Sequence, residues 1–152
     1  MQIIIKTKVE KDVNTVFEAF DLELFKKLKP PGIGLKVLRF DGCKTGDLVE
    51  LELNFGLFKQ KWKSEITESG TTDNGFFFVD ESYGKDLPFF LSDWKHRHII
   101  SKDDAGTIIT DHINFKSPYG LSFLFYPAVW LQMYLRKPVY KKTFKKEPLH
   151  RE

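Results

Sequence analysis

The feature that most limits the possible folds is a long stretch of alternating apolar and polar residues from Ile33 to Lys116. Alternation with a period of two is typical of β-strands that bury one face. Turn-forming clusters rich in Gly, Asp and Asn interrupt it at short intervals. They divide the stretch into six predicted strands, near residues 33–41, 46–54, 57–69, 75–83, 88–102 and 107–116. The connections are too short for crossover helices, so we expect consecutive strands to pair in an antiparallel meander.

The residues before this stretch predict one further strand and two short helices. Residues 3–9 alternate in the same way and are followed by charged residues. Asp12 and Asp21 each precede apolar residues at helical spacing, and aspartate is a favoured N-cap residue. Pro30 and Pro31 then prevent the second helix from continuing.

The residues after the stretch predict a long C-terminal helix. Pro118 and Gly120 end the last strand, and residues 121–146 have helical character. Proline is tolerated in the first turn of a helix but disrupts its interior. We therefore expect Pro127 to open the main segment and Pro138 to kink or divide it.

Together these elements predict one α+β domain that covers residues 1–152. The expected architecture is a helix grip, in which a curved, seven-stranded antiparallel sheet wraps around the long C-terminal helix. The two short helices lie between the first and second strands. A chain of this length can bury a sizeable core.

Composition narrows the class of protein. The 15 Phe, 5 Tyr and 3 Trp can fill a core, line a cavity or cover a surface for a partner. The net charge of +3 is small and the charges are interspersed, which argues against a nucleic-acid partner. Cys43 is the only cysteine, so an intrachain disulfide and a multi-cysteine metal site are excluded. Neither the charged N-terminus nor the proline-interrupted residues 117–135 predict a signal peptide or a transmembrane helix, and we expect a cytoplasmic protein.

Four short motifs are spread over the predicted sheet and the start of the helix. They are FKQKWKSEIT with Trp62, WKHRH with Trp94, His96 and His98, GTIITD with Gly106, Thr107 and Asp111, and SPYG with Pro118 and Gly120. With them the whole chain resembles the START-like (SRPBCC) superfamily, near its polyketide cyclase/dehydrase and uncharacterised bacterial ligand-binding branches. The resemblance implies a helix-grip domain that binds a hydrophobic small molecule, lipid-like, polyketide-like or aromatic, between sheet and helix. Members range from lipid carriers to cyclases, so the resemblance does not select an activity.

The last two predicted strands form a hairpin whose register follows from its turn. If residues 103–106 make a four-residue turn, His98 faces Asp111 across the hairpin. The opposite face of the hairpin is more polar, so we expect the His98 face to point inwards. The same register pairs Trp94 with Phe115, His96 with Ile113, and Ile100 with Ile109 on that face.

His98 and Asp111 would then be a polar pair in apolar surroundings, where an unpaired polar group costs about 1–3 kcal/mol. A carboxylate beside an imidazole fixes its tautomer and favours its protonated form. One interpretation is that the pair, together with His96, forms the polar end of a ligand pocket. The other is a satisfied core pair that fixes the register of two strands. The sequence leaves both open.

We predict that the ligand contacts side chains from the inner sheet face and from the helix. For the apolar members, plain core packing is the alternative interpretation. The predicted ligand-binding residues are Trp62, Ile66, Phe78, Trp94, His96, His98, Asp111, Ile113, Phe115, Trp130 and Tyr134.

Metal binding and catalysis are other uses for these histidines. His96 and His98 could bind a metal ion with Asp111 as third ligand, but such pairs usually have a further His or Cys ligand. We therefore predict neither a metal site nor a cofactor. No serine lies in a nucleophile context, Cys43 lies in a predicted turn, and we assign no catalytic residue. The alternative function is a cyclase, aromatase or dehydrase with His98 as general acid or base tuned by Asp111.

The C-terminal helix is apolar nearly all round between Phe123 and Leu135. One side is expected to contact the sheet, which leaves another side for a homodimer partner, a membrane surface or the two short helices. The lysines that follow are spaced to share one helix face, which is usually only solvated. Next to an apolar patch, such a face could bind an anionic membrane surface. These lysines are Lys141, Lys142, Lys145 and Lys146.

Overall fold

The structure is a computed structural model that describes residues 1–148, and it is built on a seven-stranded antiparallel sheet. The strand order is β1-β7-β6-β5-β4-β3-β2, so β2 to β7 each pair with the next strand along the chain. This confirms the predicted meander, and β1 joins it beside β7. The strands are β1 Gln2–Val9, β2 Gly34–Phe40, β3 Leu48–Asn54, β4 Lys59–Thr72, β5 Gly75–Tyr83, β6 Asp93–Asp103 and β7 Gly106–Lys116.

Four α-helices and two single 3₁₀ turns complete the described chain. Asp12 and Asp21 are N-caps as predicted, since the Asp12 side chain accepts from the backbone of Asn14 and Thr15 and Asp21 accepts from Leu24. No helix within residues 1–148 is both long and apolar enough to cross a membrane. The helical elements are α1 Val13–Glu18, α2 Leu22–Lys27, η1 Gly84–Asp86, η2 Pro118–Gly120, α3 Ser122–Tyr134 and α4 Arg136–Thr143.

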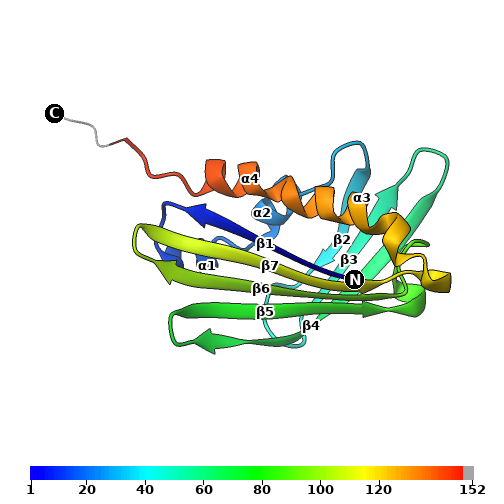
Figure 1. Ribbon diagram of the computed structural model, residues 1–152, viewed down its shortest axis with the longest axis horizontal. Coiled ribbons are helices and arrows are strands. Elements are labelled where there is room, and N and C mark those ends of the chain that lie inside the picture. Colours follow the sequence, from blue (N-terminus) through cyan, green and yellow to red (C-terminus); the bar gives the residue numbers. More distant parts are fainter. Residues whose placement is uncertain (149–152) are drawn as a thin grey trace.

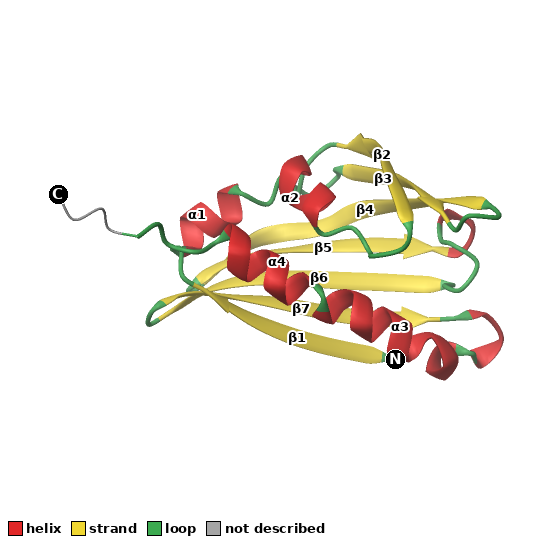
Figure 2. Ribbon diagram, turned by 90° about the horizontal axis from the view of Figure 1, so that it is seen from above, coloured by secondary structure: helices red, strands yellow, loops and turns green. Residues whose placement is uncertain are grey.

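The helices cover one face of the curved sheet. Helices α3 and α4 follow one another lengthwise across that face (Figure 1). Helix α2 lies between α4 and strands β2 and β3 when the molecule is seen from above (Figure 2). The seven-stranded sheet, the long C-terminal helix and the two short helices after β1 are those of the predicted helix grip.

The C-terminal helix is divided at Leu135, which separates α3 from α4. Pro138 lies in the first turn of α4, and its ring is incompatible with a helical carbonyl four residues earlier, at Tyr134. The predicted division by Pro138 is therefore confirmed, with the break one turn upstream. The prediction that Pro127 opens the main segment was wrong, because α3 begins at Ser122 and includes Pro127. The helical hydrogen bond lost at Pro127 would have been accepted by Phe123, which lies in the exposed first turn.

The β6–β7 hairpin has the predicted register, with His98 opposite Asp111 and Trp94 opposite Phe115. Strand β6 is shorter than predicted, because residues 88–92 belong to the connection that follows η1. On the other side of β6, Asp80 of β5 lies opposite His96. Three neighbouring strands therefore bring polar residues to the same level of the inner face.

Two apolar clusters form the core on either side of this level. The first includes Val16, Leu24, Ile66, Ile100, Ile109 and Tyr140, and the second includes Ile3, Ile5, Trp94, Ile113, Phe115, Val129 and Met133. Along β6, His96 and His98 lie between Trp94 of one cluster and Ile100 of the other. The polar residues are thus held in place by apolar packing at both ends.

Candidate functional site

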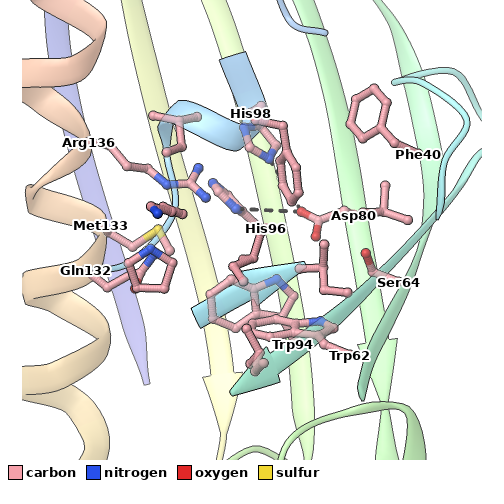
Figure 3. Close-up of a pocket in the computed structure, with 18 of the residues that line it drawn as sticks. Phe40, Trp62, Ser64, Asp80, Trp94, His96, His98, Gln132, Met133 and Arg136 are labelled. Atoms are coloured by element: carbon pink, nitrogen blue, oxygen red, sulfur yellow. Dashed lines mark ion pairs between the residues drawn. The ribbon is translucent and has the colours of Figure 1, made fainter. Parts of the chain in front are cut away.

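A cavity of about 230 Å³ lies between the inner face of the sheet and helices α2, α3 and α4. Its walls are mostly apolar, and the indole rings of Trp62 and Trp94 meet edge to face with centroids 5.0 Å apart. Polar side chains gather along one part of the wall, where Asp80, His96, His98 and Arg136 line the cavity (Figure 3). The apolar walls include Leu24, Phe25 and Leu28 of α2, Val49, Leu51 and Leu53 of β3, and Val129 and Met133 of α3.

The polar residues come from four elements. Asp80 is on β5, His96 and His98 are on β6, and Asp111 is on β7. Asp80 lies opposite His96, and His98 lies opposite Asp111. Because side chains alternate along each strand, all four of these side chains are on the inner face of the sheet. Arg136 is the first residue of α4 and reaches from the helix towards His96 (Figure 3).

His96 lies at the centre of this cluster. Its Nε2 atom is 2.8 Å from Asp111 Oδ1, which makes a hydrogen bond, and its Nδ1 atom is 3.6 Å from Asp80 Oδ1. The His98 ring stacks on the His96 ring with centroids 3.7 Å apart. From there, His98 Nε2 is 3.5 Å from Asp80 Oδ1 and its Nδ1 is 3.6 Å from Asp111 Oδ1. His96, rather than the predicted His98, is therefore the hydrogen-bonded partner of Asp111.

Both carboxylates are ionised at neutral pH. Burial alone would raise the pKa of Asp111, but the hydrogen bond from His96 and the charge of Arg136, whose Nη1 is 3.5 Å away, lower it to about 2. Burial likewise opposes ionisation of Asp80, and the adjacent His98, His96 and Arg136 side chains lower its pKa. Arg136 remains a cation, because Tyr140 and Asp111 raise its pKa against the effect of burial.

His98 is a neutral imidazole at neutral pH. Burial lowers its pKa to about 4, and the adjacent His96 ring acts in the same direction. Phe78 stacks on the other side of the His98 ring with centroids 4.2 Å apart. The ring is thus held between an apolar neighbour and His96, and its nitrogens face the two carboxylates.

Five of the predicted ligand-binding residues line the cavity. Four others are buried residues of the sheet that do not reach it. Ile66, Ile113 and Phe115 are fully buried in the two core clusters. Asp111 is also fully buried, with His96, His98 and Arg136 next to it. An inward direction therefore did not distinguish the cavity wall from the core. The five that line the cavity are Trp62, Phe78, Trp94, His96 and His98.

Trp130 and Tyr134 lie on the outer side of α3. They are 39% and 44% exposed, and their rings stack on each other with centroids 4.9 Å apart. The side of α3 that faces the cavity instead carries Val129, Gln132 and Met133, at helical spacing, and Arg136 follows at the start of α4. Because α3 is apolar nearly all round, its sequence pattern does not select the face that meets the sheet.

Several polar residues of the wall were not predicted as ligand-binding residues, among them Asp80, Asp21 and Lys29. Asp80 shares the parity of Phe78 on β5, and this parity was the available signal for an inward carboxylate. Ser64, Gln132 and Arg136 also line the cavity. In the sequence, Arg136 lies at the start of a basic stretch. The sequence pattern there does not distinguish an arginine that is buried from one that is exposed to solvent.

The four lysines of the basic stretch do not share a helix face, so this prediction was wrong. Helix α4 ends at Thr143, and Phe144 is buried with its carbonyl accepting from the backbone of Glu10 and Lys11. This packing against the end of β1 stops the helix before the last two lysines. Lys141 and Lys142 are exposed on α4, and Lys145 and Lys146 are exposed beyond it.

No protein-family model matches the chain, and no curated protein matches it. Solved structures do match it. Protein Ms6760 from Mycobacterium smegmatis is 17% identical with a TM-score of 0.68, over 97% of this chain and 92% of that one. Protein CV1439 from Chromobacterium violaceum is 17% identical with a TM-score of 0.65, over 92% and 96%. Major latex-like protein 151 from Panax ginseng is 15% identical with a TM-score of 0.54, over 88% and 96%.

At these identities the similarity is one of fold. Small bacterial and plant proteins thus share the curved antiparallel sheet and the helix grip of this chain.

Proposed function

We propose that the protein binds a hydrophobic small molecule in the cavity between the sheet and helices α2 to α4. The observation that carries the proposal is an apolar cavity whose wall includes a buried cluster of ionised and neutral polar groups. Apolar walls supply affinity, and a few fixed polar groups orient a ligand. The resemblance to the START-like (SRPBCC) superfamily points the same way, and we place the protein in its ligand-binding part.

The size of the cavity favours a small, ring-containing ligand over a long lipid. Its volume of about 230 Å³ is below the range of roughly 300–1,000 Å³ that is usual for drug-sized ligands. An apolar cavity of about 150 Å³ suffices for benzene. Among the lipid-like, polyketide-like and aromatic classes, one or two fused rings with a polar substituent therefore fit best.

Native mass spectrometry of the protein after incubation with a metabolite extract tests this proposal. We expect the protein to carry an added mass that corresponds to a compound of one or two fused rings. Ser64→Phe would fill the cavity, because Ser64 is a small buried residue of its wall, and we expect the adduct to disappear. Lys63→Phe is the matched control, since Lys63 is the exposed neighbour on the same strand. An unchanged adduct in Ser64→Phe, or no adduct in the wild type, would contradict the proposal.

Catalysis by His98 and Asp111 is the less favoured alternative. It requires both side chains to reach the ligand, whereas Asp111 is fully buried and hydrogen-bonded to His96. A histidine with a pKa of about 4 is also a poor general acid at neutral pH. A cyclase, aromatase or dehydrase reaction therefore has less support than binding.

The outer face of α3 favours a second function as an interface between two copies of the chain. Light scattering is expected to give the mass of a dimer for the wild type and the mass of a monomer for Leu131→Lys.

Flotation with anionic liposomes tests the other partner, a membrane surface. The protein would contact that surface with the help of Lys141, Lys142, Lys145 and Lys146. A monomer that does not bind liposomes would contradict both uses. The exposed apolar residues of this face are Phe123, Leu124, Trp130, Leu131, Tyr134 and Leu135.

A further inference from the structure

We propose that Asp80, His96 and His98 form a binding site for a divalent first-row metal ion such as Zn²⁺. The three residues lie on neighbouring strands, and one donor atom from each lies within 4.8 Å of the other two. No metal site was predicted from the sequence, because such histidine pairs usually have a further His or Cys ligand and none was found. The third ligand in the structure is a carboxylate, Asp80, which enters the site from β5. This inference does not depend on a ligand occupying the cavity.

The two separations between the Asp80 oxygen and the imidazole nitrogens are close to those of a tetrahedral site. Asp80 Oδ1 is 3.6 Å from His96 Nδ1 and 3.5 Å from His98 Nε2. Two ligands bound to Zn²⁺ at about 2.0–2.1 Å in tetrahedral geometry are about 3.3–3.4 Å apart. Shifts of a few tenths of an ångström would bring the Asp80 oxygen and each nitrogen to that distance. The two imidazoles, which stack with centroids 3.7 Å apart, would turn away from parallel to share the ion.

The hydrogen bond that His96 makes with Asp111 leaves the other ring nitrogen, Nδ1, facing Asp80. Ionised Asp111 can only accept, so His96 Nε2 carries the hydrogen of their 2.8 Å bond. Nδ1 is therefore the nitrogen of this ring that a metal ion would bind, and it faces Asp80 Oδ1 at 3.6 Å. A cation between these two atoms would be bound by both. In metal sites, a histidine ligand usually donates its other ring N–H to a carboxylate, which fixes the tautomer and the orientation of the ring. Asp111 is in this position.

The guanidinium of the cluster pairs with Asp111, and the groups next to Asp80 Oδ1 are the two imidazoles. Arg136 lies 3.5 Å from Asp111 and compensates that carboxylate. Asp80 Oδ1 is buried and accepts no hydrogen bond from the residues that the structure describes. Its nearest neighbours are His98 Nε2 at 3.5 Å and His96 Nδ1 at 3.6 Å, two nitrogens that can bind a metal ion. A divalent ion bound by Asp80 Oδ1 and the two nitrogens would give this oxygen the partner it lacks.

The donor set selects the type of metal. Two imidazole nitrogens and one carboxylate oxygen suit Zn²⁺, Co²⁺ and Ni²⁺, whereas Ca²⁺ and Mg²⁺ prefer sites made wholly of oxygen ligands. All three residues line the cavity. A fourth ligand to the ion, water or a polar substituent of a bound molecule, would therefore come from the cavity side.

Titration of the chelator-treated full-length protein with Co²⁺ and with Zn²⁺ tests the site. We expect one ion per chain by calorimetry, and for Co²⁺ visible absorption bands of tetrahedral intensity. Trp94 fluorescence should report the same event when Ni²⁺ is added, because its ring centroid is 5.9 Å from that of His96. Asp80→Asn and His98→Gln each remove a direct ligand, and we expect affinity to fall by at least the 10- to 100-fold that loss of a supporting group causes.

Two further variants separate metal binding from general damage. Asp111→Asn keeps the three ligands but removes the carboxylate behind His96, and we expect affinity to fall about 10- to 100-fold. His112→Gln is the control, because His112 lies on the outer face of β7 and bonds to Gln2 there. Circular dichroism confirms that each variant is folded. Absence of a 1:1 complex, or binding that Asp80→Asn and His98→Gln leave unchanged, would overturn the proposal without bearing on ligand binding in the cavity.

Discussion

Asp80 and Asp111 are both inward carboxylates, but their surroundings give them different roles. Asp111 has a hydrogen bond from His96 and a guanidinium close by, and no part of it is exposed. Asp80 lines the cavity, and its Oδ1 atom accepts no hydrogen bond within residues 1–148. Asp111 therefore organises the polar cluster from behind, and Asp80 is the carboxylate that can meet a ligand or an ion.

Replacement of Asp111 is expected to destabilise the fold strongly. Asp111→Ala leaves the buried Arg136 charge without its partner, and loss of one partner of a buried ion pair costs about 3–5 kcal/mol. Urea unfolding measures this change. Asp104→Ala, in the exposed turn after β6, is the control and should cost less than about 0.5 kcal/mol. The double variant Asp111→Leu with Arg136→Met should be more stable than Asp111→Leu alone. A loss below about 1 kcal/mol for Asp111→Ala would contradict this role.

The same carboxylate predicts a loss of stability in acid. The pKa of Asp111 in the folded protein, about 2, is below its ordinary value of 3.8. A lowered pKa means that ionised Asp111 stabilises the fold above pH 4 and that this contribution disappears as the pH falls towards 2. The free energy of unfolding should therefore decrease over this range in the wild type, and less so in Asp111→Asn. Parallel curves for the two proteins would count against the assignment.

Cys43 is expected to be a nearly inert thiol. Burial, and after it the charges of Asp80, Asp47 and Asp21, raise its pKa to about 12. The thiolate is the reactive form, so alkylation at pH 8 should be roughly 10³-fold slower than for a free cysteine with a pKa of about 8.5. The urea-unfolded chain is the control and should react at the ordinary rate. Similar rates for the folded and unfolded chains would show that the thiol is accessible and unperturbed.

Among the elements, those with local determinants could be predicted from the sequence. Alternation located the seven strands, aspartate caps located α1 and α2, and the turn at residues 103–106 fixed the β6–β7 register. Strands β5 and β6 are joined by η1 and a longer loop, so no turn rule gives their register. For this reason the position of Asp80 opposite His96 could not be calculated. Likewise, a helix that is apolar nearly all round gave no basis for choosing Val129 and Met133 over Trp130 and Tyr134.

Helix α2 is the element of the cavity wall with the least internal support, because it has only six residues. Its N-cap, Asp21, accepts from the backbone of Leu24, and Asp21→Ala should cost about 1 kcal/mol. For a chain of about 150 residues this corresponds to a melting temperature roughly 2–4 °C lower. Lys27→Ala, at the end of the same helix, is the matched control. Cavity ligands should also bind more weakly to Asp21→Ala, because Leu24 and Leu28 of α2 line the cavity. Equal affinity would mean that α2 does not limit binding.

On the scale of the whole molecule, the cavity interrupts the packing between sheet and helices. Strands β2 to β6 supply one wall, and α2, α3 and α4 supply the other. The two apolar clusters of the core lie on either side of the polar residues. A ligand in the cavity would therefore contact both layers of the domain, and its binding energy would add to the stability of the whole fold.

This coupling predicts that a small aromatic compound stabilises the protein as a whole. With 2-naphthol at 100 times its dissociation constant, the free energy of unfolding should increase by about 2.7 kcal/mol. The melting temperature should rise by roughly 5–10 °C, which differential scanning calorimetry measures. Ser64→Phe should show no increase, whereas Lys63→Phe should behave as the wild type. If 2-naphthol stabilised Ser64→Phe as much as the wild type, it would be binding elsewhere, and the exposed apolar face of α3 would be the next place to examine.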